Sequence, residues 1–357
     1  MSVTVFHGNC KDVMQRLLEE NVKVDSIVTD PPYELGFRGN SWDSTGIAHD
    51  REMWSVSRQL LKPGGHLLSF GGSRTYHRMA CAIEDAGFEI RDQIMWIYAT
   101  GFPKSVNISK ALEKKGHLEE SQKFEGWGTA LKPAHEPIVV ARKPLSEKTV
   151  AENVLKYGTG GINIEDSRVS YNGDVVSKAF DQKYKNPDEY KVYGKGIPHS
   201  LYTPSDTGRF PANIIHDGSE EVMDEFAKYG NRKSGGGDKS GKIPNTYFPG
   251  MLNEEQSIKR IAVPSEGTAA RFFYSAKASH EERIDGNRHP TMKPVALMRY
   301  LIKLVTPVNG TVLDMFAGSG TTGKAALAEG RNAILIEKEQ EYYDGILRRH
   351  AEHPTKT

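Results

Sequence analysis

The sequence has few of the features that mark secreted or membrane proteins. It contains two cysteines in 357 residues, Cys10 and Cys81, and their separation matches neither a disulfide framework nor a metal site. Its N-terminus has no basic region followed by an apolar one, and no window approaches the roughly 18 apolar residues of a membrane span. We therefore expect a soluble, cytoplasmic protein in a reducing compartment, with no membrane partner and no bound metal.

An excess of one charge sign is also absent. Lys and Arg number 47 against 46 Asp and Glu, so the global charge gives no sign of nucleic-acid binding. Any such partner would have to be bound through local clusters. One basic cluster, with a single acid (Asp238), comprises Lys228, Arg232, Lys233, Lys239 and Lys242. It is either a solvated loop or a loop that contacts DNA phosphates.

The pattern of apolar residues predicts an α/β fold. Residues 1–100 alternate short apolar runs with amphipathic segments, which is typical of strands alternating with helices across a mostly parallel sheet. Residues 88–98 and 137–141 are expected to pair as an antiparallel edge. Near the C-terminus, strands are predicted over 311–316 and 332–336, and a helix over 294–305 with a buried stripe of Leu297, Leu301, Ile302 and Val305.

The middle of the chain differs in composition. From about residue 146 to 270, glycine, lysine, tyrosine and asparagine are frequent and apolar runs are short. This indicates a loop-rich second domain or a large insertion rather than a continuation of the sheet. We expect the tyrosines there to build a small core rather than to stack on bases. They are Tyr184, Tyr190, Tyr193 and Tyr202.

A glycine loop near the C-terminus predicts a nucleotide cofactor. Residues 318–323 match G-x-G-x-x-G between a strand and a helix, and Glu337 follows Gly320 by 17 residues. An NAD-dependent oxidoreductase is one reading of this pattern. However, only 20 residues follow Glu337, so the remaining strands must come from residues 1–100, in permuted order. S-adenosylmethionine also needs glycines for close backbone approach and an acid for its ribose, and we favour it.

The stretch Asp30-Pro31-Pro32-Tyr33 follows a predicted buried strand and suggests the chemistry. The Asp30 carboxylate and the Pro31 carbonyl can each accept one N–H of an exocyclic base amine, whose lone pair is otherwise delocalised into the ring. This would pyramidalise the nitrogen and direct its lone pair at a sulfonium methyl. The prolines restrict the backbone that holds both acceptors. Tyr33 would stack on a base flipped out of duplex DNA.

Three motifs together resemble a known family. Asp30–Tyr33, then His289-Pro290-Thr291-Met292-Lys293-Pro294, then residues 314–320, are similar to the β class of S-adenosylmethionine-dependent DNA amino-methyltransferases, the N6-adenine/N4-cytosine family. The resemblance covers roughly 1–145 and 272–357. It implies a Rossmann-like methyltransferase sheet, mostly parallel with an antiparallel edge and helices on both faces, built from both chain ends. Residues 1–145 would form the catalytic half, 146–271 a target-recognition region and 272–357 the cofactor-binding half.

The resemblance also implies residue roles. Asp30, Pro31, Pro32 and Tyr33 would bind the target amine and base. Thr291 and Lys293 would contact the methionine carboxylate of the cofactor. Family members often have Asp at the position of Asn9, which is expected to contact adenine, and Asn can also donate and accept there. The full cofactor-binding set implied is Asn9, Cys10, Asp30, His289, Pro290, Thr291, Lys293, Asp314, Phe316, Ala317, Gly318, Ser319, Gly320, Thr321, Thr322 and Glu337.

The implied activity is methyl transfer to the N6 amine of a flipped adenine at a specific sequence in double-stranded DNA. By resemblance, an Asp-first tetrapeptide is more usual for adenine and a Ser-first one for cytosine N4, so N4-cytosine methylation stays open. Protein glutamine methylation is a related possibility, but by resemblance the enzymes of that family have a tetrapeptide that begins with Asn, whereas this one begins with Asp30. A non-catalytic DNA-binding protein and an NAD-dependent oxidoreductase are alternatives of other classes. The family resemblance predicts a homodimer, whereas the residues specify neither the recognition sequence nor a restriction endonuclease partner.

Overall fold

The structure of the protein, a computed structural model, describes residues 1–36, 41–101, 103, 105–170, 208–234, 239–241, 258–260, 265–276 and 292–350. The chain divides into two compact units. The first combines Met1–Ser167, Ala212–Val222 and Tyr274–Thr357, and the second combines Arg168–Pro211 and Met223–Phe273. These limits describe packing, whereas the boundaries predicted at 145–146 and 271–272 describe function and stay predictions.

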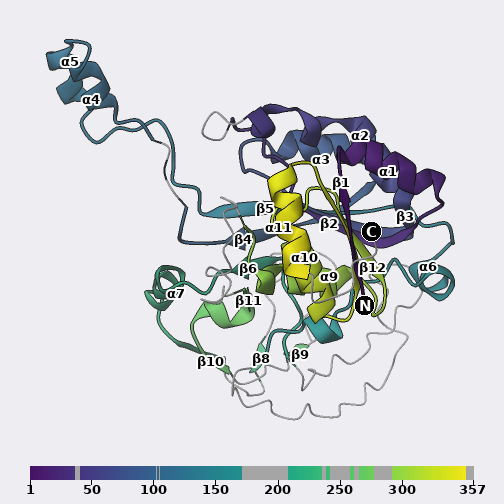
Figure 1. Ribbon diagram of the computed structural model, residues 1–357. Coiled ribbons are helices and arrows are strands. Elements are labelled where there is room, and N and C mark those ends of the chain that lie inside the picture. Colours follow the sequence, from purple (N-terminus) through teal and green to yellow (C-terminus); the bar gives the residue numbers. More distant parts are fainter. Residues whose placement is uncertain are drawn as a thin grey trace. The chain divides into compact units, whose positions relative to one another are not determined.

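The first unit contains a nine-stranded sheet, in the order β1-β13-β12-β2-β3-β5-β4-β6-β11 (Figure 1). Neighbouring strands are parallel except that β5 runs antiparallel to β3 and to β4. The predicted α/β class with a mostly parallel sheet is confirmed. The strands are β1 (Val3–His7), β2 (Val24–Thr29), β3 (Leu61–Phe70), β4 (Glu89–Ile97), β5 (His135–Arg142), β6 (Ile214–His216), β11 (Tyr274–Ser275), β12 (Thr311–Asp314) and β13 (Asn332–Glu337).

Strands from the two chain ends lie side by side in this sheet. In β12, Leu313 pairs with Ile27 of β2, and in β13, Glu337 pairs with His7 of β1. A buried carboxylate, that of Asp25, reinforces the junction by accepting a hydrogen bond from the Thr311 backbone N–H at 2.8 Å. The predicted assembly from both ends of the chain is confirmed.

The antiparallel pair predicted from residues 88–98 and 137–141 is present as β4 and β5, but it is not the edge of the sheet. Strands β6 and β11 extend the sheet beyond β4. Part of the middle region, Ile214–His216, therefore continues the sheet, contrary to the expectation from composition. A strand of three residues is too short to show a period-two pattern, so sequence periodicity could not reveal it.

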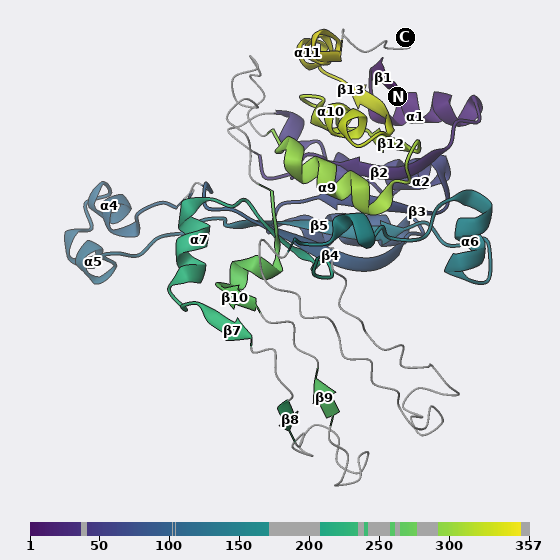
Figure 2. The same cartoon turned by 90° about the horizontal axis from the view of Figure 1, so that it is seen from below.

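Helices cover both faces of the sheet, as predicted (Figures 1 and 2). Alternate strand residues pack on opposite faces: Ile27 and Leu67 join the cluster of α1–α3, while Val28 and Leu68 join that of α9–α11. The helices on the first face are α1 (Cys10–Glu19), α2 (Arg51–Leu60) and α3 (Tyr76–Asp85). Those on the second are α9 (Val295–Val305), α10 (Thr321–Ala328) and α11 (Gln340–His350).

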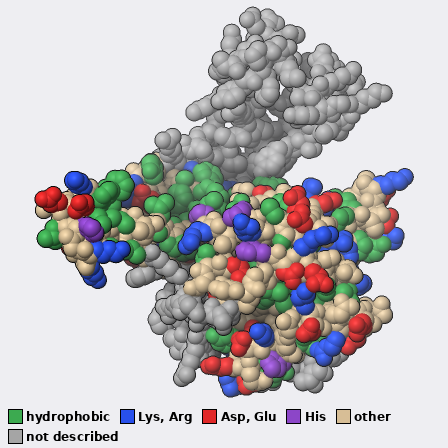
Figure 3. Space-filling view, turned by 90° about the horizontal axis from the view of Figure 1, so that it is seen from above, with side chains coloured by type: hydrophobic (Ala, Val, Ile, Leu, Met, Phe, Trp, Pro, Cys, Tyr) green, Lys and Arg blue, Asp and Glu red, His purple; other side chains and the backbone are tan. Residues whose placement is uncertain are grey.

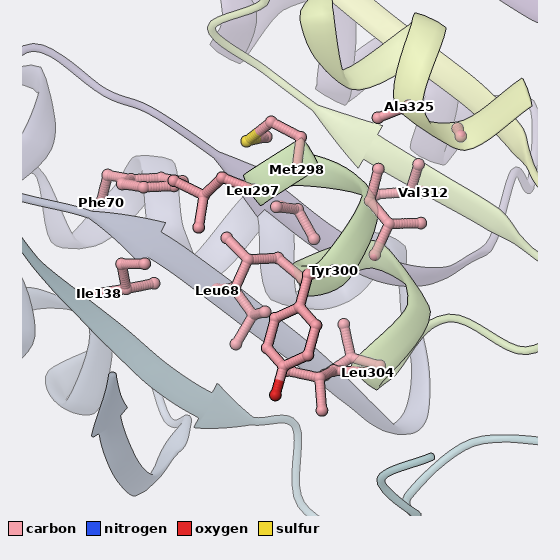
Figure 4. Packing of buried hydrophobic residues seen from close by; sticks show 14 of the residues in the cluster. Leu68, Phe70, Ile138, Leu297, Met298, Tyr300, Leu304, Val312 and Ala325 are labelled. Carbon is pink, nitrogen blue, oxygen red and sulfur yellow. The ribbon is translucent and has the colours of Figure 1, made fainter. Parts of the chain in front are cut away.

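Helix α9 is the main apolar cover of the second face. Leu297, Tyr300 and Leu304 recur at helical spacing and face the sheet beside Leu68 and Phe70 (Figure 4). The stripe predicted for this helix is confirmed, since its four residues are all buried. Full burial of one leucine stabilises a fold by about 1.5–3 kcal/mol. This packing fixes the start of α9, where Lys293 lies.

The remaining described elements are short. Within the second unit, β7 (Arg232–Ser234) pairs antiparallel with β10 (Ser265–Gly267), and β8 (Lys239–Gly241) pairs antiparallel with β9 (Ile258–Arg260). No helix in the described part of the chain is long and apolar enough to cross a membrane. Other helices are α4 (Ile108–Glu113), α5 (Leu118–Lys123), α6 (Val150–Tyr157), α7 (Glu220–Ala227), η2 (Ser41–Ser44), η3 (Ile47–His49), η4 (Glu165–Ser167) and η6 (Ala269–Phe272).

The basic cluster predicted to contact DNA lies in the second unit. Lys228 is exposed and its ammonium lies 2.5 Å from the Glu225 carboxylate. Arg232 and Lys233 belong to β7 and Lys239 to β8, whereas Lys242 lies outside the described residues, as do the four tyrosines predicted to form a core. On the face of the molecule in Figure 3, described side chains of opposite charge are interspersed. DNA contact by this cluster stays a prediction.

Candidate active site

The predicted motifs meet between β12 and β2, where the order of the strands in the sheet reverses. From β12 the chain proceeds to β13 on one side, and from β2 it proceeds to β3 on the other. The loops that follow β12 and β2 therefore diverge, and such a switch point is where open parallel sheets bind ligands. A cavity of about 460 Å³ lies there, lined by residues 30–33 and by most of the glycine loop.

This cavity brings together residues that are more than 300 positions apart in the sequence, such as Asn9 and Glu337. Every described residue predicted to bind the target or the cofactor lines it, except Gly320. His289, Pro290 and Thr291 lie outside the described residues. The predicted residues in the lining are Asn9, Cys10, Asp30, Pro31, Pro32, Tyr33, Lys293, Asp314, Phe316, Ala317, Gly318, Ser319, Thr321, Thr322 and Glu337.

Gly320 shapes the glycine loop from behind the cavity. Its φ of +78° lies in the left-handed region, which disfavours any residue with a Cβ. A Cβ there would also lie 3.0 Å from Ile346 Cγ1 of α11. The glycine thus permits close packing of the loop on α11. Gly318, with φ of +50°, is the loop glycine that lines the cavity.

Glu337 ends β13 and fixes the other side of the glycine loop. Its Oε2 accepts a hydrogen bond from the Gly318 N–H at 2.7 Å, and its Oε1 accepts one from the Glu339 N–H at 2.8 Å. Burial raises the pKa of this carboxyl above its ordinary value. Because each carboxylate oxygen has a second lone pair, Glu337 can still accept hydroxyl donors from a ligand in the cavity.

Asp314 ties β2 to the glycine loop. The carboxylate is buried and accepts hydrogen bonds from Thr29 Oγ1 at 2.7 Å, Thr322 Oγ1 at 2.5 Å and the Phe316 N–H at 3.1 Å. Desolvation by burial outweighs these bonds and raises its pKa to about 6. Asp314 thus joins Thr29, which precedes residues 30–33, to Thr322 of the glycine loop and holds these two segments together.

The raised pKa of Asp314 predicts a pH dependence of stability. This carboxyl has an ordinary pKa of 3.8 and one of about 6 in the fold, so between these values the unfolded chain releases a proton that the folded chain keeps. Its contribution is fully present below pH 3.8 and is lost as the pH rises to about 6. Relative to wild type, Asp314→Asn should gain up to about 3 kcal/mol between pH 4 and 7.

Urea denaturation of both proteins at four pH values checks this expectation. The comparison isolates Asp314 because all other titrating groups contribute equally to the two proteins. Asparagine retains an acceptor for Thr29 and Phe316, and its amide can donate to the Thr322 hydroxyl. A difference in the free energy of unfolding that does not change with pH would contradict the assigned role.

Asn9 begins α1 as its N-cap. Its side-chain Oδ1 accepts a hydrogen bond from the Lys11 N–H at 2.9 Å. Asn and Asp are comparable N-cap residues, which gives a structural reason why either suits this position. Cys10 follows it in the cavity wall, and burial raises the pKa of its thiol to about 11, so the thiol stays protonated.

Asp30 takes part in a buried cluster of charges. Lys293 Nζ lies 2.6 Å from Asp30 Oδ2 and 3.3 Å from Glu136 Oε2. The Tyr33 hydroxyl donates to the same Glu136 oxygen at 2.7 Å. Burial by itself lowers the pKa of Lys293, but the two carboxylates outweigh it and raise this pKa above its ordinary value. The Lys293 ammonium is therefore held beside Asp30, and its predicted contact with a methionine carboxylate stays a prediction.

The second oxygen of Asp30 differs from the first. Oδ1 is buried and has no hydrogen-bond partner within the described part of the chain. An unsatisfied buried polar atom costs about 1–3 kcal/mol, more when it is charged. Such an atom in the wall of a cavity is suited to accept a hydrogen bond from a ligand.

The backbone around Tyr33 is held on two sides. Thr75 Oγ1 donates a hydrogen bond to the Tyr33 carbonyl at 2.6 Å. In the segment that follows, the buried Asp43 carboxylate accepts from the Glu34 N–H at 3.0 Å and the Leu35 N–H at 3.2 Å. These bonds stabilise the conformation of residues 33–35, including the positive φ of 55° at Glu34.

Comparison with known proteins identifies the family. A profile of the family described as DNA methylase matches residues 24–348, which is most of the chain. The chain belongs to the DNA methylase family. The resemblance recognised in the sequence is confirmed.

Relatives of this DNA methylase match it over different lengths. M.HindIII, a type II methyltransferase of Haemophilus influenzae, is 25% identical over 301 residues, which cover 84% of this chain and 67% of M.HindIII. The DNA adenine methyltransferase YhdJ of Escherichia coli is 49% identical over 61 residues, 17% of this chain and 21% of YhdJ. The crystal structure of the M1.HpyAVI–SAM complex is 19% identical, with a TM-score of 0.46, and covers 97% of this chain and 98% of that one.

Glu136 is a site residue of this methylase that the sequence motifs did not reveal. It lies near the start of β5, which runs antiparallel to β3. The beginning of β5 therefore lies at the same sheet edge as the carboxyl ends of the parallel strands, where Asp30 also lies. The available signal was an acidic residue at the start of the apolar run 137–141, but its partner could be known only from the direction of the strand.

The lining contains further residues that the motifs did not indicate, among them Tyr342 of α11 and Met298 of α9. Both belong to amphipathic helices, in which aromatic and apolar residues more often build a core than a site. Among the described residues of the methylase, no group of three His, Cys, Asp or Glu side chains is arranged to hold a metal ion.

Proposed function

We propose that this DNA methylase transfers a methyl group from S-adenosylmethionine to the exocyclic N6 amine of an adenine in double-stranded DNA. One observation carries the proposal: Asp30 Oδ1, which has no hydrogen-bond partner among the described residues, belongs to a residue in the same cavity wall as Gly318 and Glu337. A hydrogen-bond acceptor for an amine and a binding loop for an adenosine cofactor thus share one space. The similarity to YhdJ, described as a DNA adenine methyltransferase, supports adenine as the target.

The residues around the cavity fit S-adenosylmethionine. Gly318 allows the backbone to approach the ligand, and the Glu337 carboxylate retains lone pairs for ribose hydroxyls. Phe316 and Tyr342 provide aromatic surface for an adenine ring. When bound, the cofactor supplies an electrophilic methyl group on a sulfonium. Asp30 and Glu136 carry two negative charges against one positive charge on Lys293, so this group of three residues has one net negative charge to match that sulfonium.

Asp30 and Pro31 activate the target amine by accepting its two N–H groups. Asp30 Oδ1 accepts one and the Pro31 carbonyl accepts the other, so the nitrogen lone pair leaves the ring system and becomes nucleophilic. With the cofactor bound, methyl transfer would form a carbon–nitrogen bond as the carbon–sulfur bond breaks, and the electron pair would stay on sulfur. The methylated nitrogen then loses one proton, which the Asp30 carboxylate can take up because it already accepts a hydrogen bond from this amine. Tyr33 provides an aromatic face on which the flipped base stacks.

Nucleoside mass spectrometry tests the activity and the target base together. The protein is incubated with unmethylated duplex DNA and methyl-labelled S-adenosylmethionine, and the digest is searched for both modified nucleosides. We expect labelled N6-methyl-2′-deoxyadenosine that depends on the enzyme. Labelled N4-methyl-2′-deoxycytidine alone would show that the target is cytosine instead of adenine. Absence of label, together with calorimetric binding of NAD, would favour the oxidoreductase reading.

Sequence specificity is assigned to the middle region. Lys and Arg side chains there would contact phosphates, and a few others would read base edges. Deletion of Arg232–Lys242 as a block should weaken DNA binding and reduce its salt dependence. With fewer phosphate contacts, binding releases fewer counterions from the DNA. Fluorescence anisotropy with labelled duplex at several salt concentrations measures both quantities. Unchanged affinity and an unchanged salt slope would remove this role.

A further inference from the structure

Glu136 is a half-buried charge to which the mechanism proposed above gives no role. Its side chain is 17% exposed, and it lines the cavity beside the residues that bind the target. The hydrogen bond from the Tyr33 hydroxyl at 2.7 Å and the ion pair with Lys293 Nζ at 3.3 Å use the same oxygen, Oε2. Removing a carboxylate from water is costly, and an apolar residue often stabilises a fold as well as a shielded charge does. Stability alone therefore does not explain a carboxylate at this position.

The ammonium of Lys293 is buried between aromatic rings and carboxylates. It is 7% exposed, and it lies 5.2 Å from the ring centre of Tyr33 and 4.9 Å from that of Phe70. These rings exclude water from the cation, so its partners are the carboxylates of Asp30 and Glu136. An ammonium has three N–H donors. With Glu136 present, these donors are shared between two carboxylates.

This sharing determines which oxygen of Asp30 is available. Lys293 engages Oδ2, while Oδ1 has no partner in the described part of the chain. If Glu136 were absent, Asp30 would be the remaining carboxylate beside the ammonium. The ammonium could then move to bridge both oxygens of Asp30, and Oδ1 would no longer be free to accept from the target amine.

We infer that Glu136 is a positioning residue for methyl transfer: it retains Lys293 on the Oδ2 side of Asp30 and fixes the Tyr33 ring through its hydroxyl. The inference rests on the proposed function, since Oδ1 matters only if an amine binds there. Two neighbouring phenols stay neutral and therefore add no negative charge to the cluster. For Tyr98, burial first and then the charge of Glu136 raise the pKa to about 12. For Tyr33, burial and the charges of Asp30 and Glu136 raise the pKa well above its ordinary value.

Two substitutions separate the acceptor of Glu136 from its charge. Glu136→Leu removes both, whereas Glu136→Gln keeps an oxygen that can accept from Lys293 and from Tyr33. Under single-turnover conditions with saturating DNA and cofactor, we expect Glu136→Leu to lower the rate about a hundredfold, as misplacement of a reacting group by about 1 Å does. Glu136→Gln should restore at least a tenth of the wild-type rate, and KM for DNA should change less than about threefold.

Substitutions of Glu84 are the matched controls, and Tyr33→Phe is a second variant that tests the same contact. Glu84 is an exposed acid of α3, so Glu84→Leu and Glu84→Gln should leave the rate unchanged. Tyr33→Phe keeps the ring and loses the hydroxyl, and it should lower the rate less than Glu136→Leu does. If Glu136→Leu does not fold, Glu136→Gln and Tyr33→Phe carry the kinetic test. A Glu136→Leu rate within threefold of wild type, or a loss confined to KM for DNA, would overturn the inference.

Thermal melting tests the contact without relying on activity. Glu136→Leu and Lys293→Met should lower the melting temperature by non-additive amounts, because each removes the same ion pair. Additive shifts would show that the two side chains act independently, which contradicts the inference. If wild-type protein transfers no methyl group to DNA, the proposed function fails, and the melting result still decides whether Glu136 holds Lys293.

Discussion

Asp30→Asn will lower the rate of methyl transfer about a thousandfold, although asparagine has the size and shape of aspartate. The reason is the fixed cation beside it. Lys293 Nζ lies 2.6 Å from Asp30 Oδ2, so an asparagine will turn its carbonyl oxygen toward that ammonium. Its amide N–H groups then face the target amine, and a donor meets a donor where an acceptor is required. Single-turnover transfer of labelled methyl groups to DNA measures the loss.

The same variant should retain its fold. It removes one negative charge that faces the sulfonium, but it should weaken S-adenosylmethionine binding far less than it lowers the rate, because Asp30 is only one residue of a long cavity wall. Asp85→Asn is the matched control: Asp85 is exposed at the end of α3, and its substitution should leave the rate unaltered. A rate for Asp30→Asn within tenfold of wild type would show that Oδ1 is not the acceptor for the amine.

Glu337→Gln will weaken S-adenosylmethionine binding by about a hundredfold, corresponding to the loss of one or two hydrogen bonds to a charged acceptor. In the wild type, both carboxylate oxygens already accept backbone N–H groups, from Gly318 and from Glu339. An amide has one oxygen, so its NH₂ group must face one of these donors. The substitution therefore removes an acceptor for the ribose and also displaces the loop that contains Gly318.

Isothermal titration calorimetry with S-adenosylmethionine and no DNA measures this effect directly. Glu341→Gln serves as the control, since Glu341 is an exposed acid in the first turn of α11 and does not line the cavity. A dissociation constant for Glu337→Gln within threefold of wild type would mean that Glu337 has only a structural role in the loop. Loss of DNA binding in the absence of cofactor would point to a wider distortion instead.

The two catalytic predictions depend on different neighbours. Asp30 pairs with Lys293, which also pairs with Glu136. Glu337 instead accepts hydrogen bonds from backbone N–H groups, among them that of Gly318 in the glycine loop. Asp314 joins these halves, since it accepts hydrogen bonds both from Thr29, just before Asp30, and from Thr322 of α10. Substitutions at Asp30 should therefore act on the rate, and those at Glu337 on cofactor affinity.

The sequence by itself determined the class of fold, the permuted order of its halves and the two motifs of the site. These features depend on local patterns: the periodicity of apolar residues, the restriction of backbone by Pro31 and Pro32, and the freedom of the glycines at 318 and 320. Each pattern is complete within a few residues. Their order along the chain then required that β2 and β12 become neighbours, and this pairing is present.

Only the tertiary structure decided which side chains meet. Lys293 was expected to contact the cofactor, yet its ammonium lies between Asp30 and Glu136. Glu136 enters the site because β5 runs antiparallel to β3, and Gly320 leaves the cavity because α11 packs against it. The reason is physical: the direction of a strand and the packing of a helix depend on contacts between distant segments. No local pattern records these contacts, although they determine which oxygen of Asp30 is left for a substrate.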